Sequence, residues 1–295
     1  MQTERTRRSN IEAAIRLLTD DDPRVVRRVE GCLVAWGRPA RIVLAEMCRD
    51  ADPQVRTRAR RLLDRIDLQL LADEVAAMAR PRGGRFQLEY ALDALHRFSR
   101  TEDFEPGAFD RQLEAFVAPL REVVEGRTSR TQARHLVGQL GHEAGFEVLD
   151  HPFEREALLP SRVLSSRVGS AAAICALYLA IGRRAGLECS PVRLGDYFLV
   201  RVHGDRRVLV DPRHGGRTVT KADCLRYLRE RGDREAGLHR IADVPDAEVF
   251  AGLLDDLIAA TSGRSAHALR RALVRVRSRV AADEVFMPLK PVPPN

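Results

Sequence analysis

The sequence predicts an α+β protein, with a helical N-terminal segment packed on a core of one buried helix and a small antiparallel sheet. Three observations favour this class. An internal repeat with helical spacing occupies the first segment, residues 170–187 are nearly all apolar, and segments between residues 191 and 210 alternate like paired strands. With 295 residues, of which 44% are hydrophobic, the chain can bury a sizeable core.

The first segment is organised by the repeat. The sequence DPRV at residues 22–25 returns as DPQV at residues 52–55, and each copy supplies an aspartate that can cap a helix and a proline suited to its first turn. We therefore expect paired antiparallel helices over residues 9–67, with Leu33 and Trp36 packed inward. Short helices around a repeated Asp-Pro-x-Val start resemble HEAT-like repeats, which need neighbours to bury their faces.

Helical spacing, helix breakers and alternation assign most of the remaining chain. We expect further helices at residues 68–80, 85–98, 107–124, 129–145, 221–231, 244–260 and 264–280. We expect strands at residues 191–194, 197–203 and 207–210, with a turn at Gly204 before the last of them. The predicted regions are therefore the helical repeats at 1–67, a second domain at 68–240, C-terminal helices at 241–285 and a disordered proline-rich tail at 286–295.

The chain is basic, with a formal net charge of +7 and a pI of about 9.6, which invites a nucleic-acid hypothesis. Of its 49 basic residues only Lys221 and Lys290 are lysine, and the arginines are interleaved with 42 acidic residues, as on solvated helix faces. Aromatic residues make up only 5% of the chain and form no basic-aromatic motif on which bases could stack. The sequence therefore argues against a nucleic-acid partner.

The longest apolar run, residues 171–181, is too short to cross a bilayer, which takes about 18 residues. The first ten residues, MQTERTRRSN, are charged and precede no apolar stretch, so we expect no secretory signal, no membrane attachment and a cytoplasmic location. We interpret the cysteines as small buried residues and expect neither a disulfide framework nor a zinc site. No CxxC pair occurs among the five cysteines, which are Cys32, Cys48, Cys175, Cys189 and Cys224.

The apolar helix and the hairpin after it suggest a family. The helix lies within RVLSSRVGSAAAICALYLAIGRRAGL (162–187), which is followed by GDYFLVRV (195–202) and VLVDPRHGGRTVT (208–220). This order resembles the transglutaminase-like core of papain fold, in which a cysteine starts the helix, a histidine lies on one strand and an aspartate before proline ends the next. With ARHLVGQLGHEAGF (133–146) and the helix around Cys224, the chain is more closely similar to the SirB family of bacterial transglutaminase-like proteins.

The resemblance implies a catalytic triad that this chain has largely lost. In the family, a helix N-terminus lowers the pKa of the thiol, the histidine deprotonates it, and the aspartate orients the imidazole. Here the cysteine position holds Ala171, the histidine position holds Tyr197, and the aspartate position holds Asp211. We refer to these three residues as the degenerate site and expect them to converge in one small cleft. SirB-type proteins commonly lack the cysteine, whereas Asp211 can equally serve the turn that follows it.

Four nearby residues allow other interpretations. Ser170 is either a helix cap or a nucleophile without a histidine, and Cys175, one turn after Ala171, is expected in the core. His203 precedes a turn and is expected at an exposed strand end. His214 follows the Asp-Pro pair and either contacts a ligand or lies in a plain surface loop. Ser170 and His214 are therefore the ligand-binding candidates.

The function expected from these residues is non-catalytic. A papain-like cleft without its thiol can still accommodate an extended peptide, and the HEAT-like segment offers a second surface, so we expect a protein or peptide partner and a scaffold role. The alternative is a hydrolase or acyltransferase of the papain-like or transglutaminase class that uses an unforeseen nucleophile. We expect no cofactor and no metal ion, and the sequence predicts no particular oligomeric state.

Overall fold

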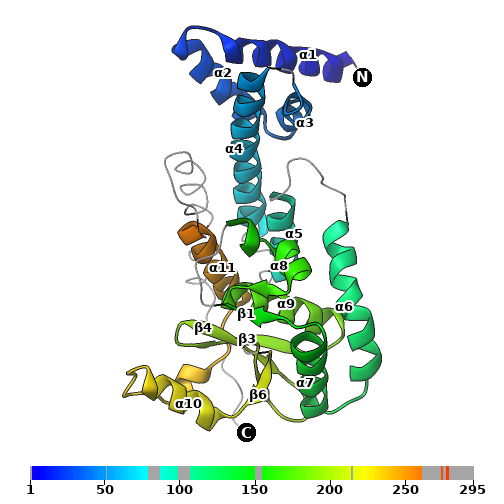
Figure 1. Ribbon diagram of the computed structural model, residues 1–295, viewed down its shortest axis with the longest axis vertical. Helices are drawn as coiled ribbons and strands as arrows, with labels where there is room; N and C mark the ends of the chain where they lie inside the picture. Colours follow the sequence, from blue (N-terminus) through cyan, green and yellow to red (C-terminus); the bar gives the residue numbers. More distant parts are fainter. Residues whose placement is uncertain are drawn as a thin grey trace.

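The computed structural model describes residues 2–50, 52–78, 87–98, 107–149, 155–213 and 215–260, together with residues 274, 277 and 278. Figure 1 shows helices α1 to α3 at one end of the molecule and a small sheet flanked by helices at the other. The α+β class predicted from the sequence is confirmed, since an antiparallel sheet lies within a helix-rich chain. No helix in the described part of the chain is long and apolar enough to cross a lipid bilayer.

The N-terminal arm comprises residues 2–50 and 52–78. Its elements are α1 (Gln2–Arg16), the 3-10 helix η1 (Leu17–Thr19), α2 (Pro23–Trp36), α3 (Arg38–Met47) and α4 (Pro53–Met78). The two copies of the repeat start α2 and α4 in the same way. Asp22 Oδ1 accepts a hydrogen bond from the Arg24 backbone N–H at 2.8 Å, and Asp52 Oδ1 accepts one from the Gln54 N–H at 2.7 Å. The aspartates therefore cap the helices that the repeat predicts.

The arm has its own hydrophobic cluster where its helices meet. Leu33 is fully buried and Trp36 packs against the cluster, as the sequence predicts. The described residues of the arm contain no strand. However, α4 runs through residue 67, where the repeats are predicted to end, because no glycine or proline interrupts the chain between Pro53 and Pro81. The HEAT-like assignment of the arm stays a prediction.

Helices also make up most of the second half. Their bounds are α5 (Leu88–Phe98), α6 (Ala108–Val124), α7 (Ser129–Val137), η2 (Gly138–Glu143), η3 (Arg155–Leu158), α8 (Pro160–Ser166), α9 (Ala171–Arg184), α10 (Lys221–Glu230), η4 (Leu238–Ile241) and α11 (Asp246–Ala260). Of these, η2 is a π-helix, and η3 and η4 are 3-10 helices. The sequence predicts neither a helix nor a strand where α8 begins. The tail at 286–295 and most of the predicted helix at 264–280 lie outside the described residues.

The main sheet contains four antiparallel strands in chain order: β3 (Cys189–Leu194), β4 (Tyr197–Val202), β5 (Val208–Asp211) and β6 (Arg217–Val219). Two further strands, β1 (Glu147–Val148) and β2 (Val168–Gly169), pair in parallel. The alternating sequence predicts β3, β4 and β5. It does not predict β1, β2 or β6, because strands of two or three residues are too short to show alternation and depend on their partners.

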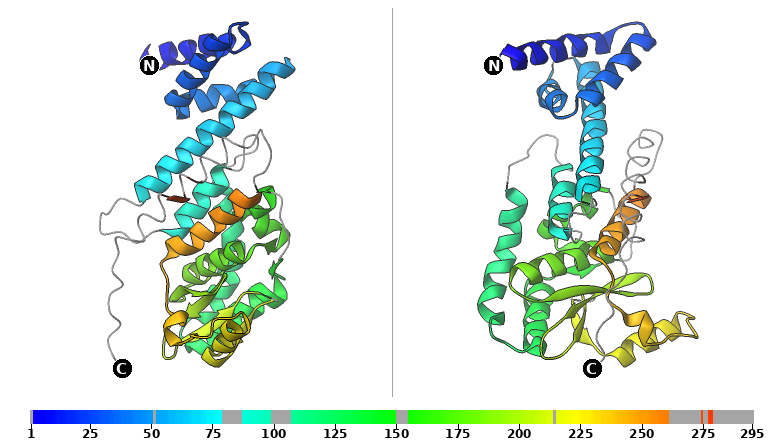
Figure 2. Two further views of the ribbon diagram at one scale, coloured as in Figure 1. Left: turned by 90° about the vertical axis from the view of Figure 1, so that its left-hand side faces the viewer. Right: turned by 180° about the vertical axis from the view of Figure 1, so that it is seen from behind.

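The two faces of the sheet pack against different helices. The side chains that face α9 and α11 are those of Phe198, Val200, Val202 and Val210. The opposite face packs against Cys224 and Leu228 of α10 through Val192, Leu194, Tyr197, Leu199 and Leu209. Figure 2 shows α10 beyond the sheet, on the side away from α9. Residues 172–182 of α9 are all buried, which explains why this helix is nearly all apolar.

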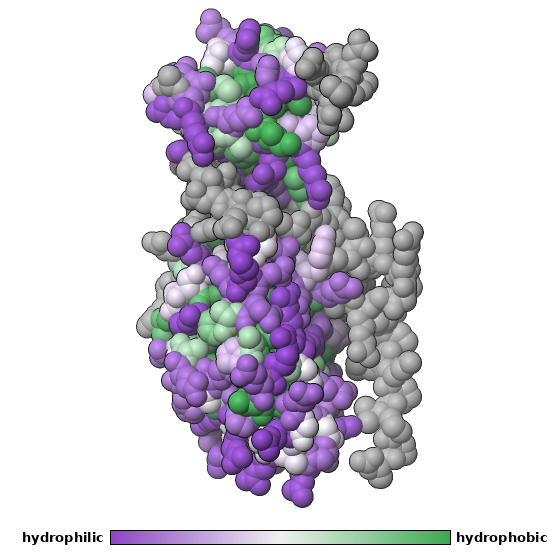
Figure 3. Space-filling model, turned by 90° about the vertical axis from the view of Figure 1, so that its right-hand side faces the viewer, coloured by the Kyte–Doolittle hydropathy of each residue, from purple (hydrophilic) through white to green (hydrophobic). Residues whose placement is uncertain are grey.

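The face of the molecule that Figure 3 shows is largely polar. Figure 3 shows one face of the molecule, on which hydrophilic side chains dominate both the arm and the lower body, with smaller hydrophobic areas between them. All five cysteines are free thiols, and four are buried. The predicted burial is wrong for Cys32, which is exposed because α2 turns Val29 and Leu33 toward the arm's cluster.

Candidate functional site

The degenerate site begins at the N-terminus of α9. Ser170 Oγ accepts a hydrogen bond from the Ala173 backbone N–H at 3.3 Å and so caps the helix. Just before it, a Cβ atom at Gly169 would lie 2.8 Å from Cγ1 of Val163, so only glycine allows β2 to pack this closely against α8. This packing fixes where α9 starts and places Ala171 in its first turn.

Ser170, one of the two ligand-binding candidates, already has structural partners. Its side chain is buried, and besides capping α9 it interacts with Asp256 of α11. Burial raises the pKa of Asp256, and the hydrogen bond to Ser170 opposes that shift. Its burial and its hydrogen bond to the Ala173 N–H favour the interpretation of Ser170 as a helix cap.

Tyr197 and Asp211 lie on the same face of the sheet. The antiparallel register of β4 and β5 places Asp211 opposite Leu199, and side chains two residues apart along a strand share a face. Ala171 packs against the hydrophobic cluster that contains Tyr197. Tyr197 and Asp211 therefore share one face of the sheet, and Ala171 at the start of α9 contacts the same cluster. The convergence of all three in one small cleft stays a prediction.

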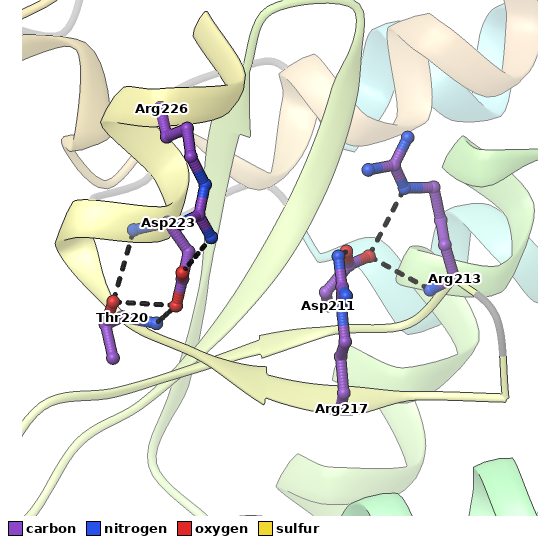
Figure 4. Close-up of polar contacts among 6 residues, drawn as sticks. All are labelled: Asp211, Arg213, Arg217, Thr220, Asp223 and Arg226. Atoms are coloured by element: carbon purple, nitrogen blue, oxygen red, sulfur yellow. Dashed lines mark hydrogen bonds and ion pairs between the residues drawn. The ribbon is translucent and has the colours of Figure 1, made fainter.

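Arg213 connects Asp211 to Tyr197. Its backbone N–H and its Nε both donate to Asp211 Oδ1, at 3.0 and 3.3 Å, and Arg217 Nη2 lies 3.6 Å from Asp211 Oδ2 (Figure 4). The Arg213 guanidinium carbon also lies 3.3 Å from the centroid of the Tyr197 ring. Because the Asp211 side chain is only 1% exposed, its charge is balanced by two arginines and hardly by solvent.

Tyr197 is a poor substitute for the missing histidine. Burial raises the pKa of its hydroxyl, and the negative charge of Asp211 raises it further. Its ring packs edge-on against the Tyr227 ring, with the centroids 5.2 Å apart. Ala171 has no reactive group and the hydroxyl of Tyr197 stays protonated at neutral pH, so these two residues do not replace the family's cysteine and histidine.

The loop after Arg213 rests directly on the π-helix η2. A Cβ atom at Gly141 of η2 would lie 1.7 Å from the Gly215 carbonyl oxygen, so two backbones are in contact here. Gly215 and Gly216 have φ angles of 74° and 77°, which favour glycine. Beneath the loop, the hydroxyl of Tyr178 is buried and has no hydrogen-bond partner among the described residues. The contact between the two backbones therefore sets how far the loop at Gly215 and Gly216 lies from α9.

The comparison with known families agrees with this arrangement. The family model of the transglutaminase-like superfamily matches residues 107–250. This range contains α9, the four-stranded sheet and all three residues of the degenerate site. The chain contains a transglutaminase-like domain. No curated protein and no solved structure gives a significant match to the chain.

The family match does not coincide with the second domain predicted at 68–240, whose bounds stay a prediction. The match starts just before α6 and reaches into α11, so the arm and α5 lie outside it.

Among the described residues, no group of three or more histidine, cysteine, aspartate or glutamate side chains is placed to hold a metal ion.

The structure describes one of the two histidines that lie near Asp211 in the sequence. His214 lies outside the described residues. His203 lies at the end of β4, as predicted, but it is only partly exposed: its side chain is 20% exposed, and its Nε2 lies 2.7 Å from Ser190 Oγ. Ser190 precedes it by 13 residues on the neighbouring strand, so local sequence gives no sign of the contact. One signal would have suggested the contact. If the pairing of Cys189 with Val202 is continued by one residue, His203 lies beside the start of β3, close to Ser190.

The thiols closest to the degenerate site are buried in the transglutaminase-like domain. Cys175 is fully buried, as the sequence predicts, and its Sγ lies 3.8 Å from the Leu199 carbonyl oxygen, to which it donates. Burial raises the pKa of Cys175, chiefly by removing solvent from the thiolate. Burial likewise raises the pKa of Cys224 to about 11, with the nearby carboxylates of Asp223 and Asp211 adding to the shift. Neither thiol is activated by its surroundings.

We expect Cys175 to resist alkylation in the native protein. At about pH 8, iodoacetamide should label exposed Cys32 and react with Cys175 roughly 100-fold more slowly, because Cys175 is both buried and protonated. Mass spectrometry of the digested protein measures both sites, and unfolding in urea should make them react alike. Fast labelling of native Cys175 that disappears in His203→Gln would contradict this prediction and restore a thiol mechanism.

Proposed function

We propose that the degenerate site of the transglutaminase-like domain is non-catalytic and that it binds a protein or peptide partner. One observation supports this most directly: the Arg213 guanidinium lies over the Tyr197 ring and binds Asp211. The carboxylate that would orient a catalytic imidazole is therefore already occupied. At the other side of the site, Ala171 offers no thiolate for the N-terminus of α9 to stabilise.

We also propose that the domain is of SirB type and that the arm is HEAT-like. The order of the segments at 133–146, 162–187 and 208–220, together with the loss of the cysteine, supports the first assignment. The identical capping of α2 and α4 supports the second. In this proposal the arm provides a second binding surface, and the protein acts in the cytoplasm without a nucleic acid, a membrane or a cofactor.

An acidic segment of the partner fits the rim of the degenerate site. Arg217 is 61% exposed beside Asp211, and Arg226 and Arg231, in and just after α10, are exposed to a similar extent. Arg217 shares the carboxylate of Asp211 with Arg213, and Arg226 and Arg231 pair with carboxylates that also face solvent. A carboxylate of a bound peptide can therefore take up the remaining hydrogen bonds of these guanidinium groups. Charge complementarity of this kind selects partners and speeds their encounter.

Fluorescence anisotropy with peptides of equal length tests this proposal on the full chain. An acidic peptide should bind more tightly than an uncharged or a basic one, and Arg217→Glu should weaken its binding about tenfold by reversing one charge at the site. Arg229→Glu makes the same charge change at an exposed position of α10 and should have little effect. Equal weakening by both variants would assign the effect to overall charge, and binding of none of the peptides would contradict the proposal.

The alternative function, a hydrolase or acyltransferase with another nucleophile, is favoured by one observation. Ser190 and His203 form a hydrogen bond at 2.7 Å, which is the contact that a histidine needs to activate a serine. This pair does not involve Ala171, Tyr197 or Asp211, so it does not depend on whether the degenerate site binds a peptide.

A further inference from the structure

The Ser190–His203 pair is held in place by the sheet. Ser190 belongs to β3, and His203 follows β4 directly. The His203 backbone N–H donates to the Glu188 carbonyl oxygen at 2.8 Å, which continues the ladder between the two strands beyond Cys189. Because both backbones are fixed by strand pairing, the short distance between Ser190 Oγ and His203 Nε2 is a property of the scaffold.

A carboxylate held by a buried arginine stands next to this pair. Arg201 donates hydrogen bonds to Asp243 and, through Nη2, to the Ile241 carbonyl oxygen at 2.6 Å. Asp243 Oδ2 lies 3.9 Å from His203 Nε2, and a backbone bridge to Val192 anchors Asp243 at the edge of β3. In a Ser-His-Asp triad the aspartate meets the other ring nitrogen. In this protein Asp243 lies near Nε2, the nitrogen that faces Ser190. Its negative charge therefore stabilises the imidazolium that forms when His203 takes the proton of Ser190.

The pair is open to solvent and has charges of both signs beside it: Asp243 and exposed Glu188 are acidic, and Arg201 and Arg207 are basic. Ser190 is partly exposed, as are the side chains of His203 and Asp243, so a ligand can reach the hydroxyl. The last paired residues of β4 and β5 are Val202 and Val208. Continuing this pairing by one residue places exposed Arg207 opposite His203. Burial lowers the pKa of Arg201, Asp243 opposes this shift, and the like charge of Arg207 adds to it. Because Asp243 already pairs with Arg201, exposed Arg207 is the cation to which a carboxylate of a substrate can bind.

The pair is also distant from the degenerate site. Tyr197 is the first residue of β4, whereas His203 follows the last. At about 3.4 Å per residue, these positions are roughly 20 Å apart along the strand. An activity at Ser190 would therefore be separate from peptide binding at Asp211.

We propose that Ser190 and His203 form an acyl-transfer site, with Ser190 as the nucleophile and His203 as its general base, for esters whose acyl group carries a negative charge. Ser190 Oγ attacks the ester carbonyl carbon while its proton moves to His203 Nε2. The bond from that carbon to the alcohol oxygen then breaks, and the proton passes to the departing oxygen. A water molecule repeats both steps on the acyl-serine, which releases the carboxylic acid and restores Ser190.

A fluorophosphonate probe on the full chain tests the nucleophile. Native protein should form an adduct at Ser190, with loss of fluoride, at a rate about 100-fold above that of the urea-unfolded chain. His203→Gln should lower the native rate by a similar factor, whereas His239→Gln, at an exposed histidine, should leave it unchanged. The comparison of native with unfolded wild-type protein requires no variant to fold. Equal rates in the two states, or an unchanged rate in His203→Gln, would overturn the proposal.

Two nitrophenyl esters test the substrate class. Release of nitrophenolate from mono-4-nitrophenyl succinate should be about tenfold faster than from 4-nitrophenyl acetate, because Arg207 attracts the succinyl carboxylate. Arg207→Gln should remove this preference, and Ser190→Ala should abolish turnover of both esters. Equal rates for the two esters in the wild-type protein would contradict the charge preference, and turnover that persists in Ser190→Ala would contradict the site.

Discussion

Gly141→Ala is expected to destabilise the transglutaminase-like domain by roughly 3–5 kcal/mol, the largest effect that the structure predicts for a single methyl group. The new Cβ would lie 1.7 Å from the Gly215 carbonyl oxygen and 2.5 Å from its carbonyl carbon. Both are backbone atoms, so no side chain can rotate to make room. Either η2 or the Gly215–Gly216 loop must move. Thermal unfolding by circular dichroism measures the change, which should lower Tm by about 10 °C.

Gly138→Ala is the matched control, because Gly138 belongs to the same π-helix. It has no positive φ, and a Cβ atom there meets nothing within 4 Å. This substitution should be neutral or stabilise the protein by up to about 1 kcal/mol, since alanine restricts the unfolded chain more than glycine does. Equal Tm values for the Gly141 and Gly138 variants would show that the two backbones are not in contact in solution.

Asp211→Ala is expected to cost about 3–5 kcal/mol in the free energy of unfolding. The substitution removes the carboxylate that balances Arg213, whose side chain is only 15% exposed, and leaves that guanidinium without its closest acceptor. It also removes the acceptor of the Arg213 backbone N–H in the turn. Urea unfolding measures the loss. The double variant Asp211→Ala with Arg213→Ala should recover part of it, because it no longer buries an uncompensated charge.

Glu114→Ala is the control for Asp211→Ala. Glu114 and Arg121 form an ion pair at 3.0 Å on α6, but both side chains are about half exposed. A solvated pair of this kind contributes roughly 0–1 kcal/mol. A loss for Asp211→Ala as small as that for Glu114→Ala would mean that Asp211 is not a structural centre of the domain.

The elements that could be predicted from the sequence are those whose signal is local. The cap at Ser170 and the apolar run after it identify α9, and the repeated Asp-Pro pairs identify the starts of α2 and α4. The short strands β1, β2 and β6 exist because distant segments pair with them, so their own residues carry little information.

The same distinction applies to the site. The order of helix and strands indicates where Ala171, Tyr197 and Asp211 lie, because a family resemblance is an ordered pattern along the chain. The contacts that decide the chemistry are spatial. The Arg213 guanidinium lies over the ring of Tyr197, which belongs to β4, and His203 contacts Ser190 on the neighbouring strand. Charged side chains of arginine occur throughout this chain, so nothing in the sequence sets Arg213 apart from the others.

The uninterrupted course of α4 affects how the protein can be divided for expression. A cut between residues 67 and 68 falls inside one 26-residue helix, which is roughly 39 Å long at 1.5 Å per residue. It would separate Ile66 from Leu70, although both pack into the cluster of the arm. A fragment that ends at residue 67 would therefore fray at its new terminus, whereas one that ends at Met78 keeps the whole helix.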